Sequence, residues 1–175
     1  MQITNSPSQL QRLLAPGGQR LIAIDGAHGS GKSTLARTLA QAMNAKLVEA
    51  DRFLTQQQGS YMPNLDCESI ARAVDPEQLC ILDGICMRQI LSSSRLTADV
   101  HVYVKRMARW GWADEDDLMF DRPVEDHLER LKKNAAPFFD DGHIVQLGLW
   151  EEVIRYHANF RPYEICHFVF LRSDA

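Results

Sequence analysis

One short segment of the sequence combines glycines, a lysine and a hydroxyl side chain at a spacing that suits phosphate binding. Residues 26–33 read GAHGSGKS, which fits the pattern G-x-x-x-x-G-K-[ST]. The glycines let the backbone wrap around a phosphate with its N–H groups inward, and the following helix N-terminus adds partial positive charge. Lys32 supplies a full charge for the β- and γ-phosphates, and the Ser33 hydroxyl is placed to ligate a bridging Mg²⁺. The residues predicted to bind the nucleotide are Gly26, Ala27, His28, Gly29, Ser30, Gly31, Lys32, Ser33 and Thr34.

Acidic side chains after two other apolar runs could complete this site. Asp83 ends the run ILDG, and a carboxylate at the tip of a buried strand can hold a Mg²⁺-bound water that faces the phosphates. Asp51, within EADRF, could accept the proton of an attacking hydroxyl group. Glu49 lies two residues earlier on the same strand face and is the alternative base. A simple turn-capping role is the alternative for both aspartates.

The elements around these residues alternate between two patterns. Runs of β-formers and helical apolar spacings follow one another, which favours an α/β fold with three layers, in which helices cover both faces of a mostly parallel five-stranded sheet. Strands are predicted at 20–25, 46–50, 79–84, 100–104 and 167–171. Helices are predicted at 7–14, 32–43, 68–74, 87–91, 123–135 and 143–159. Ligands collect at the carboxyl ends of such strands, where Asp25, Asp51 and Asp83 would meet.

The composition narrows the class of protein. With 175 residues, a net charge of −4, 45% hydrophobic and 24% charged residues, the chain is typical of one soluble globular domain spanning 1–175. Its mild acidity argues against nucleic-acid and membrane partners, and no segment approaches the roughly 20 apolar residues of a membrane span. The four cysteines show no zinc-binding spacing and are expected to be reduced. We therefore expect a cytoplasmic protein, and a homo-oligomer stays open.

Four segments together resemble the uridine kinase, phosphoribulokinase and bacterial pantothenate kinase group of P-loop kinases. They are IDGAHGSGKSTLA (24–36), ADRFL (50–54), ILDGI (81–85) and, more loosely, RYHANFRPYE (155–164). The resemblance implies a P-loop NTPase fold with strand order 2-3-1-4-5. It also implies ATP and Mg²⁺ as cofactors and phosphorylation of a hydroxyl group on a small metabolite.

The same resemblance assigns roles to the two aspartates. Asp51 matches the family's aspartate after the second strand, which serves as general base or metal ligand. Asp83 stands where many members carry a glutamate in EGI, a change that keeps the carboxylate for the metal.

Two regions depart from the family pattern. The candidate lid, residues 105–122, has few arginines, of which Arg106 and Arg109 are the candidates to reach the phosphates. The candidate acceptor loop, residues 52–67, is short and suits a small acceptor such as a nucleoside, a sugar or a vitamin precursor. Phe53 and Tyr61 could stack on that acceptor, although packing is the plainer interpretation of both rings.

Three functions compete on this basis. The leading hypothesis is an ATP-dependent small-molecule kinase in which Lys32 and Asp51 are catalytic. The second is a nucleotide-binding switch or slow NTPase, which the arginine-poor lid favours. The third is a nucleic-acid-processing ATPase, which the acidic charge and the absence of a basic stripe disfavour.

Overall fold

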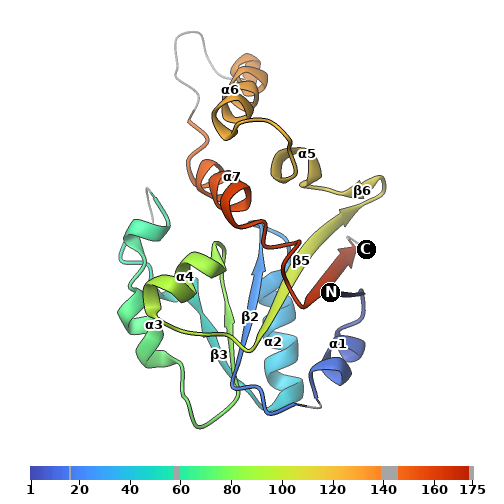
Figure 1. Ribbon diagram of the computed structural model, residues 1–175, viewed down its shortest axis with the longest axis vertical. Coiled ribbons are helices and arrows are strands. Elements are labelled where there is room, and N and C mark those ends of the chain that lie inside the picture. Colours follow the sequence, from blue (N-terminus) through green and yellow to red (C-terminus); the bar gives the residue numbers. More distant parts are fainter. Residues whose placement is uncertain (16, 57–59, 139–145, 174–175) are drawn as a thin grey trace.

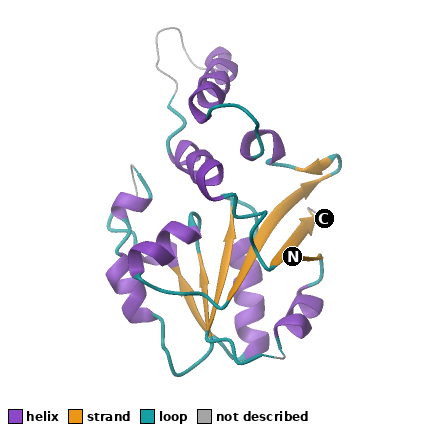
Figure 2. Ribbon diagram, viewed as in Figure 1, coloured by secondary structure: helices purple, strands orange, loops and turns teal. Residues whose placement is uncertain are grey.

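A largely parallel sheet forms the middle layer of the structure, with helices packed on both of its faces (Figure 1, Figure 2). This computed structural model describes residues 1–15, 17–56, 60–138 and 146–173. Along the sheet the strands lie in the order β1-β7-β5-β2-β4-β3, and β6 pairs antiparallel with the end of β5. The predicted three-layer α/β architecture is therefore confirmed.

The elements of the described residues alternate between strands and helices up to the fifth strand, after which a sixth strand and three α-helices precede the last strand. The strands are β1 (Gln2–Thr4), β2 (Leu21–Gly26), β3 (Lys46–Glu49), β4 (Cys80–Asp83), β5 (Val100–Ala108), β6 (Gly111–Trp112) and β7 (Phe168–Ser173). The α-helices are α1 (Pro7–Leu14), α2 (Lys32–Met43), α3 (Cys67–Ala73), α4 (Met87–Ser94), α5 (Glu115–Leu118), α6 (Val124–Ala135) and α7 (Leu149–Phe160). Single 3-10 turns cover Ala50–Phe53, Met62–Asn64 and Ala136–Phe138.

The central strand β2 is buried on both faces, as its apolar sequence predicts. Leu21 and Ala23 face a core that includes side chains of α3, α4 and α7, whereas Ile22 and Ile24 face a core shared with α1 and α2. All six residues of the strand are buried. Burial on both faces explains why the strand reads as a continuous apolar run rather than as an alternation.

The sheet has seven strands rather than the five expected. The five anticipated strands lie in the order 2-3-1-4-5 when they are numbered along the chain, as the resemblance implied. The additional strands are β1, which pairs with β7 in parallel, and β6, which pairs with β5. Both are too short, at three and two residues, to show the alternation by which a strand is recognised.

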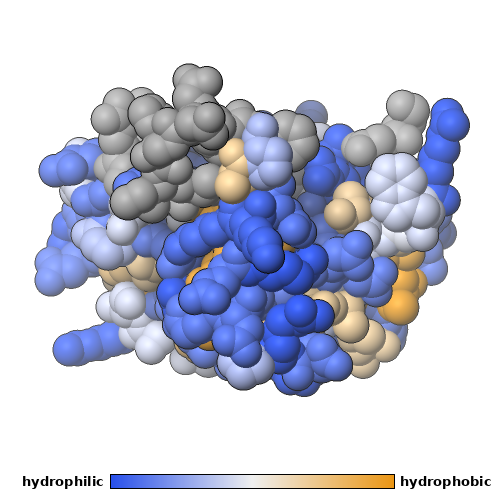
Figure 3. Space-filling model, turned by 90° about the horizontal axis from the view of Figure 1, so that it is seen from above, coloured by the Kyte–Doolittle hydropathy of each residue, from blue (hydrophilic) through white to orange (hydrophobic). Residues whose placement is uncertain are grey.

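The first residues of the candidate lid belong to a strand. β5 continues through Lys105 to Ala108, because these residues pair with β7 on one side and β6 on the other. Figure 1 shows the end of β5, β6, α5, α6 and α7 beyond the carboxyl end of β2. Seen from this end, the described residues present a mainly hydrophilic surface with small hydrophobic areas (Figure 3). Within the described parts of the chain, no helix is long and apolar enough to span a bilayer.

Candidate active site

The loop between β2 and α2 has the backbone of a phosphate cradle. Gly26, Gly29 and Gly31 all have positive φ angles, of 156°, 74° and 91°, which favour glycine. A Cβ atom on Gly26 would also lie 2.7 Å from the Ser30 hydroxyl oxygen and 2.8 Å from the carbonyl oxygen of Val104. The predicted glycine roles therefore follow from conformation and close approach together.

Two polar groups of this loop are buried. Lys32 opens α2 with only 5% of its surface exposed. The Ser30 hydroxyl is buried and makes no hydrogen bond with any described residue. A buried cation beside an unpartnered donor and a helix N-terminus is an arrangement that an anion would complete.

Ser33 and Asp83 meet across the end of the sheet. The Ser33 hydroxyl donates a hydrogen bond of 2.7 Å to Oδ2 of Asp83, while Oδ1 of Asp83 is buried and unpartnered among the described residues. Burial raises the pKa of the Asp83 carboxyl group, and the Ser33 hydrogen bond and Lys32 oppose that rise. A hydroxyl and a carboxylate are the hard oxygen ligands that Mg²⁺ prefers, so these two residues fit the predicted metal.

The described residues contain no cluster of three or more His, Cys, Asp or Glu side chains that could hold a metal alone.

Asp51 lies on the 3-10 turn that follows β3, where its side chain is exposed. Its Oδ1 atom accepts a hydrogen bond of 2.7 Å from the hydroxyl of Tyr61. Tyr61 is only 5% exposed, and its hydroxyl oxygen lies 3.4 Å from the position of a Cβ atom on Gly84. The ring therefore has little surface left for stacking, and its hydroxyl contacts the predicted base instead.

Glu49, the alternative base, is held by two arginines. Arg37 of α2 and Arg52 each donate to one of its carboxylate oxygens. Both carboxylate oxygens of Glu49 are thus occupied by guanidinium groups, and this geometry favours Asp51 for the base role.

A buried hydrogen-bonded cluster supports the phosphate loop from below. Oδ1 of Asp25 accepts from the backbone N–H of Gly26 at 2.8 Å, and Oδ2 accepts from the hydroxyl of Tyr156 on α7. Burial raises the pKa of Asp25 to about 6. Next to it, Nε2 of His157 lies 2.7 Å from the Tyr103 hydroxyl. Sequence reasoning gave Asp25 a place at this edge but missed its partner, because α7 is distant in the chain.

Comparison with known proteins shows which fold this chain shares. A family model described as Shikimate kinase matches residues 28–69, less than a third of the chain. No curated protein matches the chain in sequence. Among solved structures, a protein described as a "Possible Uridine Kinase" from Bacillus stearothermophilus aligns with a TM-score of 0.53 and 15% identity, over 94% of this chain and 96% of that chain. This chain has a P-loop NTPase α/β fold.

A second solved structure, a shikimate kinase from Acinetobacter baumannii in complex with shikimate, aligns with a TM-score of 0.46 and 14% identity. The alignment covers 97% of this chain and 89% of that chain.

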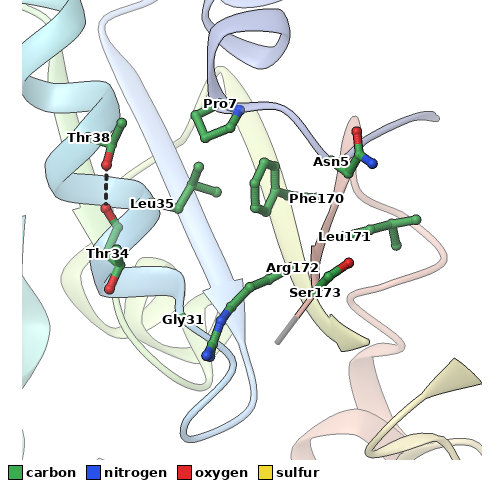
Figure 4. Close-up of a pocket in the computed structure, with 10 residues that line it drawn as sticks. All are labelled: Asn5, Pro7, Gly31, Thr34, Leu35, Thr38, Phe170, Leu171, Arg172 and Ser173. Atoms are coloured by element: carbon green, nitrogen blue, oxygen red, sulfur yellow. Dashed lines mark hydrogen bonds between the residues drawn. The ribbon is translucent and has the colours of Figure 1, made fainter. Parts of the chain in front are cut away.

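A groove beside the P-loop runs between the first turns of α2 and the end of β7 (Figure 4). It has a volume of about 500 Å³, and Gly31, Thr34, Thr38, Phe170 and Arg172 are among its lining residues. Nη1 of Arg172 donates a hydrogen bond of 3.0 Å to the carbonyl oxygen of Gly29. Sequence reasoning missed Arg172, because nothing local marks an arginine at the end of the last strand as a neighbour of the P-loop.

The two lid arginines lie elsewhere in this P-loop NTPase fold. Arg106 on β5 donates a hydrogen bond of 2.8 Å to Oδ1 of Asp114, which is buried. Arg109 lies exposed in the turn between β5 and β6. Phe53, the other predicted acceptor contact, is partly buried and packs against the core on the α3 and α4 side of the sheet. Roles for these three residues in catalysis or acceptor binding stay predictions.

Proposed function

We propose that this chain is an ATP-dependent phosphotransferase that moves the γ-phosphoryl group of Mg-ATP to a hydroxyl group of a small metabolite. The observation that carries the proposal is the gathering of three chemical roles at one edge of the sheet. Lys32 brings positive charge, the hydrogen-bonded pair of Ser33 and Asp83 brings oxygen ligands, and Asp51 brings an exposed carboxylate. Phosphoryl transfer needs little beyond such positioning and charge neutralisation.

ATP would occupy the P-loop and the groove beside it. Backbone N–H groups of the loop after Gly26 and of the first turn of α2 would face the β-phosphate, and Lys32 would neutralise the β- and γ-phosphate oxygens. The nucleoside part lies in the groove between α2 and β7, where Arg172 can lie against the base or the α-phosphate. A groove that opens directly at Gly31 and Thr34 supports this placement.

Ser33 and Asp83 would hold Mg²⁺, which neutralises phosphate charge when bound. The oxygen of the acceptor hydroxyl group attacks the γ-phosphorus in line with the bond to the leaving ADP. Asp51 accepts the proton that this hydroxyl group loses. The acceptor itself would lie toward the end of the molecule formed by α5, α6, α7 and the described part of the acceptor loop, residues 52–56 and 60–67. The mainly hydrophilic surface of that end suits a polar acceptor of the nucleoside, sugar or vitamin-precursor class (Figure 3).

One observation favours the nucleotide-binding switch as a second candidate. Arg106 is already engaged by the buried Asp114, so one of the two lid arginines predicted to reach the phosphates is committed to an ion pair. A protein that binds a nucleotide without transferring its phosphoryl group has no need of a free arginine there.

The test is ADP release from Mg-ATP with a panel of hydroxyl acceptors that includes uridine, shikimate, hexoses and hydroxy acids. We expect release that depends on one acceptor class and disappears in Lys32→Ala, because that variant lacks the charge at the phosphates. Lys133→Ala, which removes an exposed lysine of α6, is the matched control and should turn over normally. Tight binding of Mg-ATP without acceptor-dependent release across the panel would favour the switch.

A further inference from the structure

Helix α7 contacts both sides of the proposed active site through residues one turn apart. Oε2 of Glu152 accepts a hydrogen bond of 2.7 Å from the backbone N–H of Tyr61 in the acceptor loop. Tyr156 donates to Asp25, which in turn accepts from the backbone of Gly26 in the P-loop. Residues four apart lie on the same face of a helix, so one face of α7 joins the acceptor side to the nucleotide side.

Tyr61 is fixed at both of its ends. Its backbone N–H is held by Glu152, its ring is buried beside Gly84, and its hydroxyl donates to Oδ1 of Asp51 at 2.7 Å. The ring is rigid, so the position of its backbone sets the position of its hydroxyl.

Asp51 needs such support. It lies in a single 3-10 turn and is exposed, so nothing in its own element restricts the rotation of its side chain. A hydrogen bond to Oδ1 selects one orientation of the carboxylate and leaves Oδ2 for another partner. A base that must meet a hydroxyl group beside the γ-phosphate loses much of its effect when it is misplaced by about 1 Å.

We infer that Tyr61 and Glu152 are positioning residues, which use α7 to hold the Asp51 carboxylate toward the phosphates bound at the P-loop. The inference rests on the proposed phosphotransferase function. Neither residue touches the reacting atoms: Glu152 fixes the loop, Tyr61 transmits that position, and Asp51 does the chemistry.

The test compares Tyr61→Phe, Glu152→Ala and Glu152→Gln with the wild-type chain in steady-state kinetics with the acceptor found in the panel. Tyr61→Phe keeps the ring and loses the hydroxyl, so we expect kcat to fall roughly 10- to 100-fold with little change in the KM for ATP. Glu152→Ala should lower kcat similarly, whereas Glu152→Gln keeps an oxygen acceptor and should stay within about threefold of wild type.

Two controls separate positioning from a loss of structure. Glu151→Ala removes the neighbouring carboxylate, which pairs with Lys132 and Arg155 rather than with the acceptor loop, and should leave kcat near wild type. In an Asp51→Asn background, Tyr61→Phe should change kcat by less than about twofold, because the residue through which it acts is already disabled. If Tyr61 had only a structural role, Tyr61→Phe would lower kcat by the same factor in the wild-type protein and in Asp51→Asn.

Amide hydrogen exchange gives a readout that needs no acceptor. We expect the Tyr61 amide to exchange much faster in Glu152→Ala than in wild type, and at nearly the wild-type rate in Glu152→Gln. Wild-type exchange in Glu152→Ala, or a wild-type kcat in Tyr61→Phe, would overturn the inference while the kinase itself stood. If no acceptor in the panel is phosphorylated, the proposed function and the catalytic part of the inference fail together, and exchange alone decides whether Glu152 holds the loop.

Discussion

The hydroxyl of Ser33 and the carboxylate of Asp83 are 50 residues apart in sequence and are joined by a hydrogen bond of 2.7 Å. Ser33 is fixed by the first turn of α2 and Asp83 by the end of β4, which pairs with β2 on one side and β3 on the other. Two rigid elements thus bring both oxygen donors to one point. Rigid placement of ligands is what a weakly held cation such as Mg²⁺ requires.

We predict that Asp83→Asn raises the Mg²⁺ concentration needed for half-maximal ATP binding by roughly 10- to 100-fold, because a neutral amide is a poorer ligand than a carboxylate. Titration of Mg²⁺ at fixed nucleotide concentration measures this shift. Asp121→Asn, which neutralises an exposed acid near the lid, should leave the Mg²⁺ requirement unchanged. An unchanged requirement in Asp83→Asn would remove Asp83 from the metal site.

Asp51→Asn should leave the affinity for ATP within a few-fold of wild type and lower kcat by roughly 10²- to 10⁴-fold, the usual contribution of a general base. Nucleotide titration and acceptor-dependent ADP release measure the two quantities separately. Glu49→Gln is the comparison, since it removes the carboxylate that two arginines hold. Near-normal turnover in Asp51→Asn, with a large loss in Glu49→Gln, would transfer the base role to Glu49.

Arg172→Ala should weaken the binding of a non-hydrolysable ATP analogue by about fivefold to twentyfold, because it removes a cation from the groove beside Gly31. Calorimetric titration with that analogue provides the measurement. Arg12→Ala, on the exposed face of α1, serves as the charge-matched control and should bind normally. Equal affinities for the two variants would remove Arg172 from the nucleotide-binding site.

His157 should make the fold less stable in acid. Burial lowers its pKa to about 4, and its ring is hydrogen-bonded to the carbonyl oxygen of Val153 and to Tyr103. The unfolded chain takes up this proton near pH 6.5 and the folded chain only near pH 4, so the free energy of unfolding falls as pH decreases through that interval, by up to about 3 kcal/mol. Chemical unfolding of His157→Gln should show a smaller loss between pH 6.5 and 4 than wild type.

Asp25 should act in the opposite direction. Its pKa is raised to about 6 from 3.8, so the folded chain binds this proton more tightly and gains stability as pH falls from 6 toward 4. In the wild-type chain, the change in the free energy of unfolding with pH is therefore the difference between the loss due to His157 and the gain due to Asp25. Asp25→Asn removes the gain, and its stability should fall more steeply than that of wild type over the same interval. Parallel pH curves for the two proteins would contradict this assignment.

The parts of the site that sequence alone predicted are those with a local signal. The P-loop is recognised from the spacing of its residues and from its position between a buried strand and a helix. Asp83 is recognised from its position at the end of an apolar run. The order of the five main strands also came from the sequence, through the resemblance to a kinase group, and the structure confirms it.

The parts that sequence missed depend on contacts between distant segments. Lys105 to Ala108 look polar and non-regular, yet they extend β5 because β7 and β6 supply partners on both sides. Arg172, Glu152 and Tyr156 each belong to an ordinary strand or helix, and only the folded arrangement brings them to the P-loop or the acceptor loop. For Tyr61 the sequence suggested either stacking on an acceptor or packing in the core. The structure shows a buried ring whose hydroxyl donates a hydrogen bond to Asp51, a contact that no local pattern indicates.

The bond between Tyr156 and Asp25 spans 131 residues of the chain. A ribosome that has just finished the P-loop must therefore work for on the order of ten seconds more before the helix that supports Asp25 has been made. During that interval the Asp25 carboxylate has no Tyr156 hydroxyl to donate a hydrogen bond to it. The nascent chain thus carries the nucleotide-binding sequence early, and gains a finished nucleotide-binding surface only when α7 leaves the exit tunnel.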